Sequence, residues 1–265
     1  MKYLYTKEGQ LFGELKYCSN IFTNYKKHSH CMLSFSVIEN GELSVKYDTD
    51  AMTLHTESIA VFNPHQIHCT NNINASGYYV LYLDINWCQN IQKELFQNYK
   101  TFIHINENII INQTIYNNLI KACKTILTKD HNEYEEALIT IVKNIFVKYC
   151  NSKRVKTGQY NQNIIYKMKK YINDNLDKPI SIDDISNNLA YNKSYLIRLF
   201  KKETGITPQD FIINQKINRA KELIRKSNTT TLSDLAQTVG FYDQSHFNRN
   251  FKRIFALSPK YYQTT

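Results

Sequence analysis

The chain has 265 residues, of which 42% are hydrophobic and 21% charged, and its formal net charge at pH 7 is +10. This length exceeds the usual size of one domain, so we expect two domains. The composition is typical of a folded protein and excludes a disordered chain. No stretch approaches the apolar length of a membrane span, and the first residues lack a cleavable signal pattern, so we expect a cytoplasmic protein without a membrane partner.

Basic residues concentrate in the C-terminal part of the chain. Residues 161–265 contain 17 Lys and Arg against 9 Asp and Glu, whereas residues 1–160 contain 16 against 14. This asymmetry suggests a polyanion partner for the C-terminal part. All six cysteines precede residue 151, and no two have the spacing of a zinc or redox motif. We interpret them as reduced core thiols and predict neither a metal nor a cofactor.

The first 105 residues favour strands, because short segments rich in β-branched and aromatic residues alternate with turn formers. Asn40-Gly41 is a strong hairpin signal between two of these segments. Several short strands at this spacing predict a sandwich or barrel. The clearest strand segments are 31–38, 41–48, 58–63 and 77–85.

Helical periodicity replaces the strand pattern between residues 107 and 150. We expect an antiparallel helix pair that packs one face on the barrel. A spare apolar stripe would suit a partner subunit, but both helices could equally serve only to complete the fold. Residues 151–163 are polar and basic and predict a linker. The predicted domains are therefore 1–150 and 164–265, the second all helical. The apolar positions of the helix pair are Ile115, Leu119, Ile126, Leu138, Val142, Ile145 and Phe146.

Residues 181–211 and 231–262 resemble each other. Ser181 and Thr231 are each followed three positions later by Asp, which fits a helix N-cap with a carboxylate near the positive helix end. Apolar residues then recur at helical spacing up to a short break, after which Asn192 and Asp243 are suited to cap a second helix. Each copy is thus predicted to be a helix, a short turn and a second helix.

The second helix of each copy is expected to bury apolar residues and to turn amides, hydroxyls and cations outward. This is the helix-turn-helix arrangement. Arg pairs with guanine, Gln and Asn pair with adenine, and Lys neutralises phosphates, so the outward side chains suit double-stranded DNA. A merely solvated helix face explains one copy as well, but two matching copies favour DNA. The predicted DNA-binding residues are Ser194, Tyr195, Ile197, Arg198, Lys201, Lys202, Gln244, Ser245, His246, Asn248, Arg249 and Lys252.

The segments SYLIRLFKKETGITPQDFI and LAQTVGFYDQSHFNRNFKRIFALSPKYY resemble the two helix-turn-helix units of the AraC/XylS family of bacterial transcription regulators. The resemblance implies two such units joined by a central helix, here from Pro208 to Lys226. It also implies a homodimer, a promoter and RNA polymerase as partners, activation as the commoner outcome, and a place on the nucleoid. Ala256 and Gln263 depart from the family, which usually has Gly and a basic residue there.

The stretch from His28-Ser29-His30 to His65-Gln66-Ile67-His68 is similar, more loosely, to the cupin-like sensing domain of this family. A metal-binding cupin needs an acidic ligand shortly after the paired histidines, and Ser34 and Phe35 stand there instead. We therefore expect a small-molecule pocket or ordinary core residues. The candidate ligand-binding residues are His28, His30, Phe35, Phe62, His68 and Tyr82.

The sequence therefore predicts an α+β protein of two domains: a cupin-like β-barrel with a helix pair, followed by an all-α domain with two helix-turn-helix units. The predicted function is a sequence-specific transcription regulator, not an enzyme, that responds to a small molecule of unknown identity. One alternative is a ligand-independent regulator controlled by its abundance or by a protein partner. Another is a cupin metalloenzyme with a DNA-binding tail.

Overall fold

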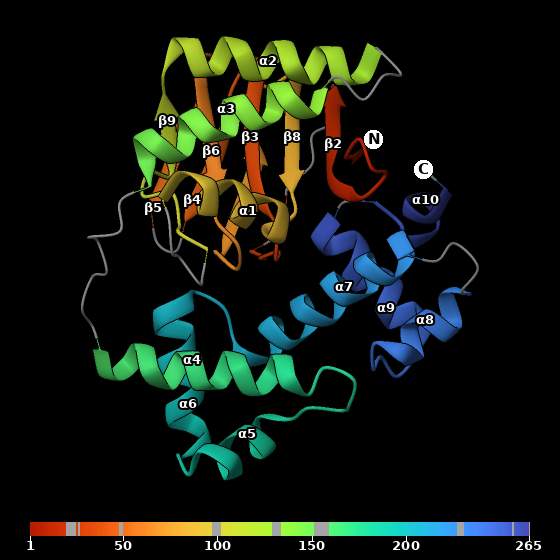
Figure 1. Cartoon of the computed structure of the whole chain (residues 1–265). Helices are drawn as coiled ribbons and strands as arrows, with labels where there is room; N and C mark the ends of the chain where they lie inside the picture. The colour runs from red at the N-terminus through yellow and green to blue at the C-terminus, as the bar shows by residue number, and fades with distance from the viewer. Residues whose placement is uncertain are drawn as a thin grey trace.

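The computed structural model describes residues 1–19, 25, 27–47, 50–96, 102–128, 134–150, 159–226, 231–255 and 257–264. A β-rich N-terminal domain lies above a helical C-terminal domain (Figure 1), so the predicted α+β class is confirmed. Most of the predicted linker, residues 151–158, and Ala256 lie outside the described residues. In the described ranges, no helix has the length and apolar character needed to cross a membrane.

Two antiparallel sheets build the N-terminal domain. One has the strand order β1-β2-β8-β3-β6-β9 and the other the order β5-β4-β7. The two sheets face each other across a core to which both contribute, as Val45 and Phe62 illustrate. The strands are β1 (Lys2–Tyr5), β2 (Leu11–Ser19), β3 (Leu33–Asn40), β4 (Leu43–Tyr47), β5 (Asp50–Leu54), β6 (Ser58–Phe62), β7 (His68–Asn72), β8 (Gly77–Leu83) and β9 (Ile109–Ile111).

Three helices cover the outer face of the larger sheet (Figure 1): α1 (Ile85–Phe96), α2 (Gln113–Thr128) and α3 (Tyr134–Tyr149). All seven apolar positions predicted for the helix pair are buried, which confirms the helical periodicity. Helix α1 was not predicted, since the segment was assigned to the strand region. It begins because the Asp84 carboxylate accepts hydrogen bonds from the backbone N–H groups of Asn86 and Trp87, at 2.8 and 3.2 Å.

The predicted hairpin at Asn40-Gly41 is wrong. Strand β3 pairs with β6 and β8, whereas β4 pairs with β5 and β7, so the turn carries the chain from one sheet to the other. The turn chemistry itself is present, because Gly41 has a φ of +87°. Its backbone is also crowded, since a Cβ there would lie 2.5 Å from the carbonyl oxygen of Asn74. Local sequence fixed the turn, but contacts from distant strands decided the pairing.

The C-terminal domain has two hydrophobic cores joined by one long helix. Phe211 and Ile212 of α7 pack in the first core, and Ile217, Ala220 and Ile224 of the same helix pack in the second. Helix α7 has the bounds predicted for the central helix, and α4 begins within the range predicted as linker. The helices are α4 (Gln159–Asp174), α5 (Ile182–Leu189), α6 (Lys193–Thr204), α7 (Pro208–Lys226), α8 (Leu232–Thr238), α9 (Gln244–Phe255) and α10 (Pro259–Thr264).

The N-terminal domain contacts both of these cores. Ile67, in the loop before β7, is 4% exposed and packs in the first core, around α4 to α6. Met1 packs against the second core, around α7 to α10. The position of the β-rich domain is therefore tied to the positions of both helix-turn-helix units.

Candidate functional site

Hydrogen-bonded caps start the helices of the first helix-turn-helix unit. The Ser181 hydroxyl accepts from the N–H of Asp184 at 3.2 Å, and the Asp184 carboxylate accepts from the N–H of Ser181 at 2.8 Å, which completes a capping box. The side chain of Asn192 then accepts from the N–H groups of Ser194 and Tyr195, at 2.9 and 3.3 Å. The second helix, α6, starts where the sequence predicted.

The second unit repeats this construction. Thr231 accepts from the N–H of Asp234 at 3.1 Å, and Asp243 accepts from the N–H of His246 at 2.6 Å. The two turns match as well, because Ala190 and Gly240 both have left-handed backbones, with φ of +56° and +74°. The internal repeat seen in the sequence is thus a repeat of backbone geometry.

Helix α6 buries Leu196, Leu199 and Phe200 and leaves the predicted DNA-binding side chains on its other side. Ser194, Arg198 and Lys201 are exposed and follow one another at spacings of four and three residues, so they form one outward stripe. Lys202 is exposed beside this stripe, while Tyr195 and Ile197 flank it and are half-buried.

Helix α9 buries Phe247, Asn250, Phe251, Ile254 and Phe255. Among its predicted DNA-binding residues, His246 and Asn248 are half-buried; the exposed ones are Gln244, Ser245, Arg249 and Lys252.

His246 and Asn248 are less free than the exposed positions. The His246 ring packs edge-on against Phe241, with 5.3 Å between ring centroids. The Asn248 side-chain oxygen is buried without a hydrogen-bond partner among the described residues.

Most cations on these two helices have no carboxylate partner among the described residues, although Lys193 pairs with Asp183 and Arg253 lies 3.7 Å from Asp210. Within the described part of the chain, Arg198, Lys201, Lys202, Arg249 and Lys252 form no ion pair with a carboxylate. A cation that serves only stability on a helix surface is commonly paired at a spacing of three or four residues. Five unpaired cations on two outward faces are instead available to an external polyanion.

The predicted ligand residues of the barrel gather around a very small cavity. His28, His30, Phe62, His68 and Tyr82 all line it, but its volume is only about 20 Å³. That is room for roughly one water molecule, whereas pockets for small molecules usually measure about 300–1,000 Å³. Among the described residues, the side chains that line this cavity leave little free space between them.

Phe35 does not belong to this group. It lies in the core between the larger sheet and the helices, because successive strand residues point to opposite faces and its neighbours Ser34 and Ser36 take the interior positions. The prediction that Phe35 lines the barrel interior is wrong for this reason.

The three barrel histidines are close to one another, and two of them have lowered pKa values. The ring centroids of His28 and His68 are 4.4 Å apart, and those of His30 and His68 are 5.0 Å apart. Burial, together with the neighbouring histidines, lowers the pKa of His30 and of His68 well below the usual value. Among the described residues, no three His, Cys, Asp or Glu side chains are grouped so that they could hold a metal ion.

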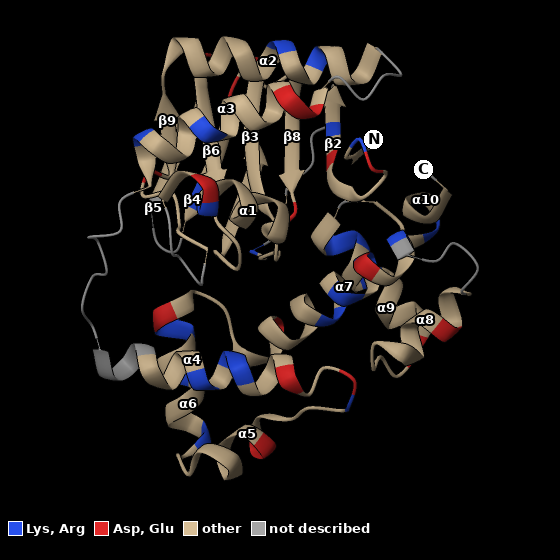
Figure 2. Ribbon diagram, viewed as in Figure 1, with Lys and Arg blue, Asp and Glu red and all other residues tan. Residues whose placement is uncertain are grey.

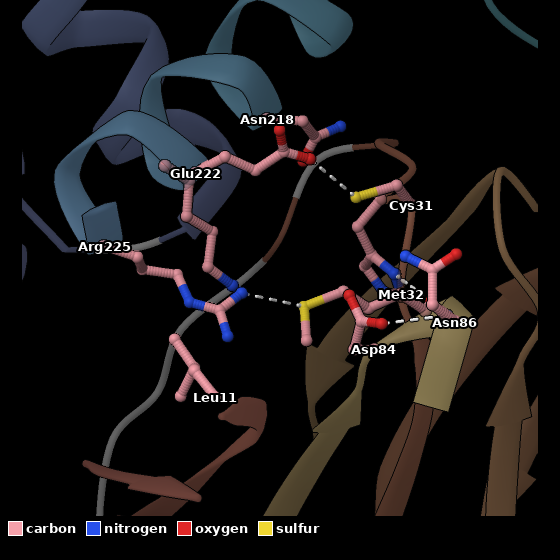
Figure 3. Close-up of a pocket in the computed structure, with 10 residues that line it drawn as sticks. Leu11, Cys31, Met32, Asp84, Asn86, Asn218, Glu222 and Arg225 are labelled. Carbon is pink, nitrogen blue, oxygen red and sulfur yellow. Dashed lines mark hydrogen bonds between the residues drawn. The ribbon is translucent and has the colours of Figure 1, made fainter. Parts of the chain in front are cut away.

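A larger pocket, of about 370 Å³, lies between the two domains. Figure 3 shows α7 side chains on one wall and residues of the β-rich domain on the other. The Cys31 thiol, whose pKa burial and Glu222 raise to about 12, donates to the Glu222 carboxylate at 3.4 Å. The lining residues are Leu11, His30, Cys31, Met32, Asp84, Asn86, Asn218, Lys221, Glu222 and Arg225.

Arg225 is the least satisfied polar group of this pocket. One of its terminal nitrogens lies 3.7 Å from the Met32 sulfur, and its Nε is buried without a hydrogen-bond partner in the described structure. Sequence reasoning missed this pocket, because Asn218, Glu222 and Arg225 recur at helical spacing and resemble a solvated face. Only the tertiary contact turns that stripe toward another domain.

Beside the pocket, a buried ion pair joins the domains. Lys221 donates to Glu14 of β2, and the Tyr262 hydroxyl donates to the other Glu14 oxygen at 2.6 Å. Burial by itself would raise the pKa of Glu14, but Lys221 and Arg225 outweigh it and the pKa is lowered. The Lys221 ammonium also lies 4.6 Å from the ring centroid of Tyr82.

The fold and the two outward helix faces together define a double helix-turn-helix DNA-binding protein with an attached sensing domain. Comparisons with known proteins agree. A model of a helix-turn-helix domain matches residues 185–265, and a model of an AraC-like ligand binding domain matches residues 20–142.

Curated relatives match the C-terminal domain. The TetD protein of transposon Tn10, from Escherichia coli, is 35% identical over 105 residues, which are 40% of this chain and 75% of TetD. The multiple antibiotic resistance protein MarA of Escherichia coli is 35% identical over 101 residues, which are 38% of this chain and 79% of MarA. The chain belongs to the AraC family of transcription regulators. It is a DNA-binding regulator rather than an enzyme.

A solved structure matches the whole chain. ToxT from Vibrio cholerae, with a bound unsaturated fatty acid, has a TM-score of 0.63 and 14% sequence identity, and the match covers 99% of this chain and 97% of ToxT. Another ToxT structure contains (E)-4-(8-methylnaphthalen-1-yl)but-3-enoic acid, and its TM-score is 0.61. At this level of identity the similarity concerns the fold.

Proposed function

We propose that the chain regulates transcription by placing α6 and α9 in successive major grooves of a promoter. Arg198 and Arg249 would read bases, and Lys201 and Lys252 would neutralise phosphates. The full set comprises the twelve residues predicted from the sequence: Ser194, Tyr195, Ile197, Arg198, Lys201, Lys202, Gln244, Ser245, His246, Asn248, Arg249 and Lys252.

One observation carries this proposal: two helices with matching caps and turns each present an exposed Arg and an exposed Lys that form no ion pair with the described carboxylates. Selection of genome fragments by the purified full-length protein tests it, followed by binding measurements at two salt concentrations. We expect a discrete asymmetric site that covers about two major-groove segments, with a specific affinity well above that for random DNA. Weak binding that ignores sequence and vanishes with salt would contradict the proposal.

We further propose that a small-molecule effector binds in the pocket between the domains and not in the barrel interior. The volumes of about 370 and 20 Å³ support this assignment. A ligand in the larger pocket would touch both α7 and the β-rich domain. Its affinity would therefore depend on how the domains are arranged, which is the requirement for coupling ligand binding to DNA binding.

A carboxylic acid is the first effector class to test. Both ToxT ligands named above are carboxylic acids. Here Arg225, with its unpartnered Nε, provides a guanidinium that suits a carboxylate, while Leu11 and Met32 provide apolar contact.

Thermal unfolding with a panel of unsaturated fatty acids and short aromatic acids tests this proposal. A ligand present at about 100 times its Kd stabilises the folded state by about 2.7 kcal/mol. We expect this gain in stability for the unsubstituted full-length protein and no gain for Arg225→Ala. Arg225→Lys should show a smaller gain, because it keeps the positive charge but loses the paired N–H groups of the guanidinium. A panel without effect would favour the ligand-independent regulator.

The remaining parts of the proposal concern the oligomeric state, the protein partner and the location in the cell. We propose a homodimer, and the 63% exposed Val147 on α3 supports an apolar contact there. We also propose that the regulator activates transcription through contact with RNA polymerase, and that it works on the nucleoid in the bacterial cytoplasm. Sedimentation of the full-length protein tests the dimer, and transcription in vitro from a selected site tests activation.

A further inference from the structure

A second cleft between the domains lies beside the DNA-reading helices. Its volume is about 390 Å³, and it is enclosed by the end of α6, the start of α7, the end of α9 and the segment that precedes β3. Its lining residues are Lys27, Lys201, Gly205, Ile206, Thr207, Asp210 and Arg253.

The charges in this cleft favour an anion. Three cations, Lys27, Lys201 and Arg253, face one carboxylate, that of Asp210. One Asp210 oxygen already accepts from the Thr207 hydroxyl at 2.7 Å, and the other lies 3.7 Å from Arg253, which is longer than a hydrogen bond. Among the residues that line the cleft, the three cations therefore outnumber the single carboxylate.

The cleft also lies between the two recognition helices. Lys201 is in the last turn of α6, and Arg253 is in the last turn of α9. When two recognition helices occupy successive major grooves on one face of DNA, the backbone strands that separate those grooves pass between them. In that arrangement, a cationic hollow between the ends of α6 and α9 would face phosphates. Figure 2 shows further basic positions along α4, α6 and α7.

Lys27 reaches this place from the sensing domain. Its ammonium donates to the Gly205 carbonyl at 3.4 Å, just beyond the end of α6. The backbone that follows Lys27 is held by two domains, because His28 pairs with His68 through N–H to oxygen bonds of 2.9 Å, and the Ser29 carbonyl accepts from Asn218 of α7 at 2.9 Å. The position of this cation therefore follows the position of the β-rich domain.

We propose that this cleft binds a backbone phosphate of the DNA strand between the two grooves, and that Lys27 makes the sensing domain part of the DNA interface. The proposal rests on the function proposed above and extends it to a residue outside the helix-turn-helix units. It gives an effector a direct means of control, since any ligand that shifts the β-rich domain against α7 adds or removes a phosphate contact.

The salt dependence of DNA binding by the full-length protein tests the proposal. We expect Lys27→Ala and Arg253→Ala each to lower the slope of log affinity against log salt by about one unit, with sequence preference unchanged. Between 50 and 200 mM salt the affinity of each variant should fall roughly threefold less than that of the unsubstituted protein. Lys27→Arg should keep the slope. The matched control is Lys46→Ala, an exposed lysine of the same domain on β4.

A slope for Lys27→Ala equal to that of Lys46→Ala would overturn the proposal. The proposed function has its own control, because Arg249→Ala should relax the preference at one or two base pairs whichever way the Lys27 result falls. Neutral methylphosphonate links, placed one at a time in the selected site, then locate the contact. One link between the two groove segments should weaken the unsubstituted protein but not Lys27→Ala.

A free phosphate compound is the other source of the same chemistry. Two results together would make the cleft a site for a free anion. Inorganic phosphate would raise the melting temperature of the DNA-free protein but not that of the double variant with Lys27→Ala and Arg253→Ala, and no methylphosphonate link would weaken DNA binding. Those results would overturn its assignment to DNA. Sensitivity of one DNA phosphate, without any effect of inorganic phosphate, would support the assignment.

Discussion

Glu14 of β2 and Lys221 of α7 form a buried ion pair across the domain boundary, although 207 positions separate them in the chain. The Glu14 side chain is 2% exposed and that of Lys221 is 7% exposed. Tyr262 of α10 donates to the same carboxylate. One acidic residue of the sensing domain thus holds both the central helix and the last helix of the DNA-binding domain.

Removal of one partner of this pair should be strongly destabilising, because the other charge would remain buried without compensation. We expect Glu14→Gln or Lys221→Met to lower the free energy of unfolding by about 3–5 kcal/mol, measured by urea denaturation. Glu14→Gln combined with Lys221→Met should cost clearly less than the two single changes together. Strict additivity would show that the two side chains do not interact energetically.

The two left-handed turn residues provide a pair of opposite predictions. Gly240→Ala should destabilise by about 1–2 kcal/mol, because a left-handed backbone strains an L-residue. The new Cβ would also lie 2.7 Å from the Lys216 ammonium, which donates to the Gly240 carbonyl at 2.8 Å. Ala190→Gly, on an exposed turn, should instead stabilise the fold by up to about 1 kcal/mol. This gain is the backbone strain that glycine relieves, reduced by the greater conformational entropy that glycine gives the unfolded chain. Thermal unfolding of both variants would show shifts of the same sign if the turns were not equivalent.

The C-terminal domain could be predicted closely from the sequence because its signals are local. Caps such as Ser181 and Asn192, and the spacing of buried residues such as Phe247 and Phe251, act within a few turns of one helix. An internal repeat doubles that signal. The bounds of α7 followed from its cap at Thr207 and from Pro208 in its first turn.

The sheets and the interdomain pocket could not be predicted in the same way, because distant contacts decide them. Gly41 marks a turn in the sequence, but β3 and β4 do not pair with each other across it, because β3 pairs with β8 and β4 with β7, both further along the chain. Ser34 faces the barrel interior and Phe35 the helices, and a shift of one residue in register would exchange them. Asn218 and Arg225 belong to a pocket only because the β-rich domain covers them.

Arg249 should contribute to base discrimination if α9 enters the major groove. We expect Arg249→Ala to weaken binding to the selected site by about 1–3 kcal/mol and to relax preference at one or two base pairs, with little change on random DNA. Arg198→Ala is the corresponding change in α6. Competition binding with single-base variants of the site measures both, and an unchanged preference would remove the residue from the base-reading surface.

Lys252 should behave differently from Arg249, although both are exposed on the same helix. We expect Lys252→Ala to weaken binding to all sequences alike and to lower the salt slope by about one unit, because a phosphate contact has no sequence information. Lys201→Ala should do the same from α6. A change in sequence preference with an unchanged slope would place these lysines at base edges.

The lowered pKa values of His30 and His68 predict that acid destabilises the fold. The pKa values of His30 and His68 in the folded protein lie well below the usual value of about 6.5, so the unfolded chain binds more protons as the pH falls. Stability from each group is complete above pH 6.5 and is lost at up to about 1.4 kcal/mol per pH unit below it. Replacement of His30 by Asn should remove one such contribution from the slope between pH 6.5 and 5.

That pH window keeps the measurement separate from Glu14, whose lowered pKa confines its loss of stability to pH values below about 4.5. Urea denaturation at four pH values measures the slope. His55→Asn is the matched control, because His55 is exposed and carries its bond to Glu42 at the surface. If His30→Asn and the control had the same slope as the unsubstituted protein, His30 would be accepting a proton in the folded barrel. Its hydrogen bonds to Met32 and Ser34 would then have to be reassigned to an imidazolium.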